Sequence, residues 1–362
     1  MHAIDHTNGQ LLSARAVCKD TQSKNLDAST GEAPPGMPTD AAVRRALRGR
    51  LPSDFGRRRP LRLGWLALAI TTVLLHLAVT QAVLAGNMSP WWMALSLPIA
   101  AFTWPCFFFT LHELGHGALL PPGRMRRIAS AFAAFPILLQ PTLWTAVHNH
   151  HHRFANHEAD LDRRRILGDI DEAAGILHDF SNPFVILTLI AAVQLVFLSQ
   201  LGGFLSGQIS LPVQRRQVVI ELVIAVLCTI GASWLMGWQL LLCGWLPCAM
   251  AGFSLQNIYL ITNHMSRPMT RDADSLGTTV SVQLLGGWSH MDFGRHVEHH
   301  LFPHVSHDQL AAVTASLRER YPARFHERSL LGAVRRLFEL PGYYLSANVL
   351  TDRSRTWRVT ID

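Results

Sequence analysis

The chain has 362 residues, of which 49% are apolar and only 16% are charged. Soluble domains carry about 25% charged residues, so this composition excludes an ordinary water-soluble globule and favours a membrane-embedded unit. The net charge of +7 is concentrated beside apolar segments, as expected next to an anionic membrane surface, and we therefore expect membrane lipids and no nucleic acid as partners.

The N-terminal region changes character before the first apolar segment. Residues 1–42 are polar and rich in Ala, Ser, Thr, Pro and Gly, which predicts a disordered arm. Eight arginines then precede the first apolar run: Arg44, Arg45, Arg48, Arg50, Arg57, Arg58, Arg59 and Arg62. The positive-inside rule places this end of the chain in the cytoplasm.

Six apolar stretches follow, and four of them are predicted to span the membrane. The predicted spans are about 63–85, 91–111, 218–236 and 239–262. The segment at about 184–204 is broken by Gln and Gly, and we expect it to be an in-plane or re-entrant helix. The stretch at 128–144 is interrupted by prolines and is predicted to be one helix in the interface or packed on the domain. Four crossings place both termini and all histidine-rich regions on the cytoplasmic side.

Beyond the last span the chain is polar, with helical spacing at 308–321 and 333–340. We therefore predict an all-α integral membrane protein with four transmembrane helices and a cytosolic helical cap. Its expected parts are the arm at 1–42, a membrane domain at 43–325 and a C-terminal cytosolic tail at 326–362.

Histidine is the unusual residue, because fifteen of the 19 lie between residues 112 and 307. They form HELGH at 112–116, HNHHH at 148–152 and HVEHH at 296–300. The i, i+3 and i+4 members of such clusters share one helix face. Imidazole is the commonest metal ligand in proteins, and eight imidazoles are too many for one ion and suit two. The eight predicted ligands are His112, His116, His148, His151, His152, His296, His299 and His300.

Two other interpretations of the histidines remain open. Isolated histidines, including His290 and His307, are expected to be structural, and His150 and His304 are expected to be structural or to support the ligands rather than to bind metal. The first cluster also matches HExxH, in which Glu113 would be the general base of an intramembrane zinc protease. That hypothesis needs one further ligand and leaves the other two clusters unexplained.

The clusters resemble the three histidine boxes of the membrane fatty acid desaturase superfamily, which are integral-membrane di-iron enzymes. The matching segments are HELGH at 112–116, HNHHHRFAN at 148–156 and HVEHHLFPH at 296–304. The resemblance implies four transmembrane helices under a cytosolic cap, and box histidines that bind two iron ions (Fe2+/Fe3+). It also implies a ninth ligand at His264, which follows the last predicted span.

The same resemblance implies the reaction and its partners. The sequence is similar to those of acyl-lipid desaturases, which use O2 and a reduced electron carrier to introduce a cis double bond into a fatty acyl lipid. A lipid or carotenoid hydroxylase or ketolase on the same scaffold is the alternative. The implied electron donor is a ferredoxin-like or other small electron-transfer protein, and the implied location is a bacterial-type inner membrane. The arginines at 44–62 and 124–127 either dock that donor or simply follow the positive-inside rule.

Four further residues are candidates for contacts that support the ligands. Glu298 and Asp292 flank the third box and could accept hydrogen bonds from ligand N–H groups, unless they are solvated surface carboxylates. Glu113 and Asn156, in the first and second boxes, are expected to have the same kind of supporting role.

Overall fold

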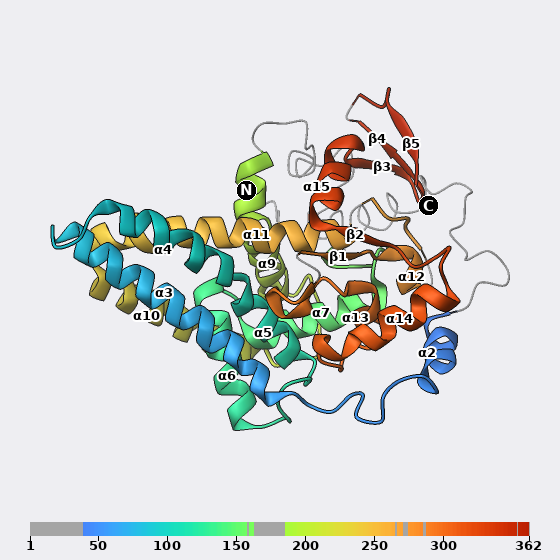
Figure 1. Cartoon of the computed structure of the whole chain (residues 1–362), viewed down its shortest axis with the longest axis horizontal. Helices are drawn as coiled ribbons and strands as arrows, with labels where there is room; N and C mark the ends of the chain where they lie inside the picture. The colour runs from blue at the N-terminus through green and yellow to red at the C-terminus, as the bar shows by residue number, and fades with distance from the viewer. Residues whose placement is uncertain are drawn as a thin grey trace, which may run out of the picture.

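The computed structural model describes residues 39–157, 159–162, 185–264, 266–270, 274–284, 287–352 and 354–361, without the side chains of 185–193. The described chain is mostly helical (Figure 1). Its long apolar helices are α3 (Gly64–Leu84), α4 (Pro90–Thr103), α5 (Pro105–Gly115), α10 (Arg215–Leu240) and α11 (Leu246–His264). In Figure 1, α3, α4, α10 and α11 form an elongated lobe on the left, and the shorter elements gather on the right.

Three helical segments are long and apolar enough to cross a membrane, and the number is four if the bent pair Arg124–Ile137 and Pro141–Phe154 is one span. They are Pro60–Leu84, Pro90–Gly115 and Arg215–His264. The third has 50 residues, and an α-helix of that length would measure about 75 Å, more than twice the hydrocarbon core of a bilayer. Gly237, near the end of α10, interrupts the segment with a φ of 73°, so the 50 residues do not form one continuous helix.

Contacts at both ends show that α10 and α11 run in opposite directions. Near the start of α10, Glu221 accepts a hydrogen bond from the Thr142 backbone N–H at 3.0 Å. Beyond the break, the Gly244 carbonyl lies 3.2 Å from Nε2 of His76 in α3. The chain then returns along α11 to His264, among the other clustered histidines. The predicted third and fourth spans therefore form a helical hairpin.

The surface of the long helices is strongly apolar. Only 6% of the most apolar window in 215–264 is buried within the protein. Exposed tryptophans gather near the two turns at the end of the lobe opposite the histidines: Trp91, Trp92, Trp234 and Trp238. Tryptophan is enriched at membrane–water interfaces, and exposed apolar surface of this extent is stable only against lipid or a partner. The described helices thus have the surface of a membrane-embedded bundle.

The single helix predicted at 128–144 is wrong. The structure has α6 (Arg124–Ala134), a 3-10 turn η2 (Phe135–Ile137) and α7 (Pro141–Phe154), with an 88° bend between the two parts. Leu138 adopts a left-handed φ of 57° at the bend. Pro141 then supplies the fixed φ of a first helical turn, so α7 starts in a new direction and carries the second histidine box.

Helix α9 (Val185–Ser206) occupies the segment predicted at about 184–204. It contacts α11 and runs across the direction of the long helices in Figure 1. The start of the chain also differs in detail from the predicted arm. Residues 1–38 lie outside the described residues, whereas helix α2 (Asp40–Arg48) begins inside the range assigned to the arm.

The remaining elements are short, and all except η1 and η4 gather beside the histidines in a part of the molecule that we call the cap. The helical ones are η1 (Pro60–Leu63), η4 (Leu241–Trp245, a π-helical turn within the hairpin), α12 (Ser275–Thr278), η6 (His290–Asp292), α13 (His296–Leu301), η7 (His307–Leu310), α14 (Ala311–Arg320) and α15 (Leu330–Glu339). The strands are β1 (Ser281–Gln283), β2 (Glu327–Ser329), β3 (Tyr343–Ser346), β4 (Val349–Thr351) and β5 (Arg358–Thr360). The all-α prediction omitted these strands because three or four residues are too few to show an alternating pattern.

Two contacts join distant segments into the cap. Strands β1 and β2 pair in parallel, which fastens the beginning of the predicted tail to the segment before the third box. Val43 and Leu47 of α2 belong to the same buried apolar cluster as Val297 and Leu301 of α13. The third histidine box is therefore held by elements from both ends of the described chain.

Gly294, just before α13, tests this packing. A Cβ at this position would lie 1.9 Å from the carbonyl oxygen of Val282 in β1. We expect Gly294→Ala to lower the free energy of unfolding by about 3 kcal/mol, because the obstacle is backbone and cannot rotate away. Thermal unfolding in detergent measures this. Gly49→Ala, where a Cβ meets nothing within 4 Å, should leave the midpoint nearly unchanged; equal effects would contradict the packing argument.

Candidate metal centre

Nine histidines from four segments of the chain converge into two groups. The first group contains His112, His116, His148, His152 and His299. The second contains His151, His264, His296 and His300. Within each group, one ring nitrogen of every histidine lies within 4.8 Å of the others. The structure thus brings together all eight box histidines and His264.

The two HxxHH boxes divide between the groups in a regular way. In α7, His148 and His152 join the first group while His151 joins the second. In α13 the division is reversed, and only His299 joins the first group. Successive helical residues are about 100° apart, so i+4 lies about 40° to one side of i, and i+3 about 60° to the other. An i, i+4 pair can therefore hold one ion while the i+3 residue reaches a neighbouring ion.

The ring nitrogens face one another at short distances. His152 Nε2 lies 3.0 Å from Nε2 of both His148 and His299. In the second group, Nε2 of His296 and Nε2 of His264 are 2.6 Å apart. A neutral imidazole has one acceptor nitrogen, and two such nitrogens repel unless a proton or a cation lies between them. The donor sets therefore fit two metal ions of the kind that imidazole binds, namely iron, zinc, copper or nickel.

Burial supports the same fit. His112 is fully buried, and Nε2 of both His112 and His116 has no hydrogen-bond partner in the described chain. Burial, together with the neighbouring imidazoles, holds the pKa of His296, His299 and His300 well below the ordinary value. These rings are consequently neutral at pH 7, which is the form that binds metal.

Asp160, which the sequence analysis missed, orients one of these rings. It is 1% exposed, and its Oδ2 accepts a hydrogen bond from Nδ1 of His151 at 2.9 Å. This contact fixes the tautomer of His151 and leaves its Nε2 free to bind a metal. The only sequence signal is the position of Asp160 in a short acidic stretch after the second box.

Asn156 supports the second group through the backbone. Its side-chain nitrogen donates hydrogen bonds to the carbonyl oxygens of His264 (3.3 Å) and Thr278 (3.0 Å). Its own backbone N–H donates to Asp160 at 3.1 Å. Asn156 therefore connects the end of the second box to the C-terminal end of α11.

The roles predicted for Glu298 and Asp292 are corrected. Glu298 is fully buried and hydrogen-bonds to Ser281 and to Thr314 Oγ1, the latter at 2.5 Å. Asp292 lies 3.7 Å from Arg62 and 3.8 Å from Arg295. Neither carboxylate makes a hydrogen bond to an imidazole in the described residues. Glu298 instead anchors α13 to β1 and α14, because its side chain points away from the two histidine groups.

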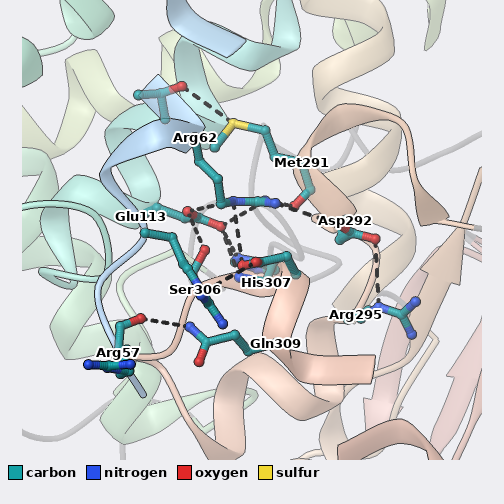
Figure 2. A network of polar contacts seen from close by, with 12 residues as sticks. Arg57, Arg62, Glu113, Met291, Asp292, Arg295, Ser306, His307 and Gln309 are labelled. Atoms are coloured by element: carbon teal, nitrogen blue, oxygen red, sulfur yellow. Dashed lines mark hydrogen bonds and ion pairs between the residues drawn. The ribbon is translucent and has the colours of Figure 1, made fainter. Parts of the chain in front are cut away.

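Glu113 lies in a buried polar network beside the first group (Figure 2). Its carboxylate accepts hydrogen bonds from Ser306 Oγ and from the backbone N–H of His307, both at 3.0 Å, and pairs with Arg62 at 3.2 Å. A carboxylate so fully engaged is not placed to act as the general base of a zinc protease. The first group also has five histidines, whereas a catalytic zinc is held by three protein ligands.

His307 was expected to be an isolated structural residue, yet it lies against the first group. Its ring stacks on His299 at 4.7 Å between centroids and lies 5.3 Å from the ring of His112. Its Nδ1 lies 3.0 Å from Glu113 Oε1. His307 therefore connects the Glu113 network to the first group. The sequence does not reveal this role, because His307 lies outside the spacing of the three boxes.

Comparison with known proteins places these residues in a family. The family model described as fatty acid desaturase matches residues 89–330, roughly two thirds of the chain. The matched range includes both histidine groups, Asn156 and Asp160. A search of curated proteins found no match.

Asp160 provides a test of the second group. We expect Asp160→Asn to lower metal affinity by about 10–100-fold, because the amide cannot match the carboxylate as acceptor for His151 Nδ1–H. Metal content after dialysis against a graded chelator measures the effect, with Asp54→Asn, a partly exposed carboxylate paired with Arg59, as control. Unchanged metal retention in Asp160→Asn would contradict the orienting role.

Proposed function

Because the chain belongs to the fatty acid desaturase family, a family of oxidoreductases, we propose that it is an O2-dependent acyl-lipid desaturase with two iron ions. One observation carries the proposal: nine imidazoles from four separate segments, six of them buried and three partly buried, converge into two adjacent groups. The product we propose is a cis double bond in a fatty acyl chain.

The protein's contribution to the reaction is to hold and orient. His112, His116, His148, His152 and His299 would bind one iron, and His151, His264, His296 and His300 would bind the other. When bound, the iron pair supplies the redox chemistry that lets O2 remove two hydrogens from an unactivated acyl chain. Asp160 fixes the orientation of His151. Burial lowers the pKa of His296, His299 and His300, which keeps these three rings neutral and able to bind metal.

Aromatic side chains exclude water around the first group. Phe293 lies 5.1 Å and Trp144 lies 6.1 Å from the ring of His112, measured between centroids, and Phe108 lies 6.5 Å from it. Trp144 also stacks on His148 at 4.8 Å. Phe108 is on α5, on the side of His112 that continues into the apolar helix, so an acyl chain approaching from the bilayer would meet an apolar surface.

We propose a four-span topology, with α3, α4–α5, α10 and α11 as the spans and α9 in the plane of the interface. The exposed tryptophans would mark the outer interface, and the cap, both termini and the metal centre would lie in the cytoplasm. We place the protein in a bacterial-type inner membrane. Under this proposal, the predicted division into 1–42, 43–325 and 326–362 describes an arm, the membrane domain with its cap, and a tail packed on the cap.

The proposed electron donor is a small acidic protein such as a ferredoxin. Arginines on the surface of the cytoplasmic end include Arg45, Arg48, Arg57, Arg58 and Arg124, all exposed. Charge complementarity would steer an acidic donor to this end of the molecule.

Heterologous expression tests the activity. We expect about two irons per chain and a new cis-monounsaturated fatty acid, detected by gas chromatography–mass spectrometry of the total lipids. His299→Gln should abolish the product, because it removes a ligand of the first group. His304→Gln, an exposed histidine of the same box segment, should retain it.

Three outcomes would contradict this proposal. A hydroxylated or ketolated product without a new double bond would favour the hydroxylase or ketolase alternative. One zinc per chain would favour the protease hypothesis. Equal activity of the two histidine variants would show that the first group does not hold a catalytic metal.

Labelling tests the topology. A single cysteine introduced at Asn87, in the turn between α3 and α4, in a variant without the native cysteines, should react with a membrane-impermeant maleimide added to the outer face of intact cells. A cysteine at Asp54, before η1, should react only after the membrane is opened. The reverse pattern would contradict the proposed orientation.

A further inference from the structure

A basic pocket, separate from the histidine groups, lies between the C-terminal end of α11, strand β2 and helix α15. Three arginines line it, Arg267, Arg328 and Arg336, together with the polar residues Thr262 and Ser266. Each element contributes part of the wall, because α15 packs on both α11 and β1.

Arg267 is unusually buried for a cation. It is 4% exposed, and its guanidinium makes one hydrogen bond in the described residues, from Nε to the Gly277 carbonyl at 2.9 Å. Burial, reinforced by the charges of Arg328 and Arg336, lowers the pKa of Arg267 to about 10. The nearby carboxylate of Asp274 is already held by Arg324 at 2.6 Å. In the part of the chain that the structure describes, none of the three pocket arginines forms an ion pair.

Three guanidinium groups around one pocket repel one another, and a buried cation without a counter-charge is destabilising. Arginine side chains bind phosphate groups through paired N–H donors, and such charge-assisted hydrogen bonds are the strong ones. An anion in the pocket would therefore offset the repulsion and use donors that the protein leaves unengaged.

We propose that this pocket binds the phosphate group of an anionic glycerophospholipid from the cytoplasmic leaflet. This inference needs the membrane location of the long helices but not the desaturase activity. The phosphate would contact Arg328 and Arg336 at the mouth and Arg267 at the base.

The position of the pocket favours a lipid over a free anion. Thr262 belongs to the last turn of α11, so the pocket lies where that apolar helix reaches the membrane surface. Helix α15 also carries exposed apolar side chains, Leu331 at 80% and Phe338 at 57%. Basic residues beside exposed apolar ones are typical of helices that lie on anionic membranes.

Binding to defined lipids tests the proposal. Purified full-length protein in neutral detergent would be titrated with phosphatidylglycerol, phosphatidylcholine or inorganic phosphate, with the unfolding midpoint and native mass spectrometry as readouts. We expect one tightly retained phosphatidylglycerol that raises the midpoint. Arg328→Gln combined with Arg336→Gln should weaken this binding about tenfold or more, since two charged contacts are lost.

Arg335→Gln is the matched control. Arg335 neighbours Arg336 on α15 but is exposed and pairs with Glu339 at 2.5 Å. The Arg335→Gln variant should bind phosphatidylglycerol as the unmodified protein does. The double variant should fold at least as stably without lipid, because the repulsion between its arginines is removed.

Equal loss of phosphatidylglycerol binding in Arg335→Gln and in the double variant would overturn the pocket assignment. Full stabilisation by inorganic phosphate alone, or by phosphatidylcholine, would overturn the assignment to an anionic lipid. These measurements do not involve catalysis, so the lipid-binding proposal can be refuted without refuting the desaturase proposal.

Discussion

The whole structure depends on nine buried or partly buried imidazoles whose ring nitrogens point at one another. Each buried nitrogen without a partner costs about 1–3 kcal/mol, and contacts such as His296 Nε2 to His264 Nε2 at 2.6 Å add repulsion between acceptors. A bound metal ion removes both the cost of the unpartnered nitrogens and the repulsion between them, because one ion accepts lone pairs from several nitrogens. Metal binding in such a centre also contributes to the free energy of folding, because the ion joins separate segments of the chain. The long apolar helices, the cap and the small strands form the scaffold that brings α5, α7, α11 and α13 to this place.

Polar networks around the centre keep the rings in position. Asp160 holds His151, Asn156 holds the end of α11, and Glu298 holds α13 against β1 and α14. In the first box, His112 faces the histidines while the adjacent Glu113 faces Arg62, as expected for neighbours about 100° apart on a helix. One short motif therefore supplies both a candidate ligand and a structural anion.

The sequence predicted the histidines that recur at helical spacing and missed the site residues that occur singly. The i, i+3, i+4 spacing gave all eight box histidines, because helical geometry fixes which side chains share a face. The spacing did not reveal that His151 and His299 cross to the other group, since that depends on how α7 and α13 face each other. Asp160 and His307 are single residues brought to the site by loops, and no periodicity marks them. The bend between α6 and α7 shows the same limit: prolines signalled an interruption, but the 88° angle comes from the left-handed residue at Leu138 and from packing.

The segment before α3 also supports the third histidine box. Helix α2 packs on α13 through Val43 and Leu47, and the chain then crosses the cap in Figure 1 to reach α3. On this path Arg62 donates to the Met291 carbonyl at 2.5 Å and pairs with Glu113. The arginines before α3 are thus not all alike. Arg57 and Arg58 are exposed, whereas Arg62 is mostly buried and connects η1 to Glu113 of α5 and to Met291 in η6.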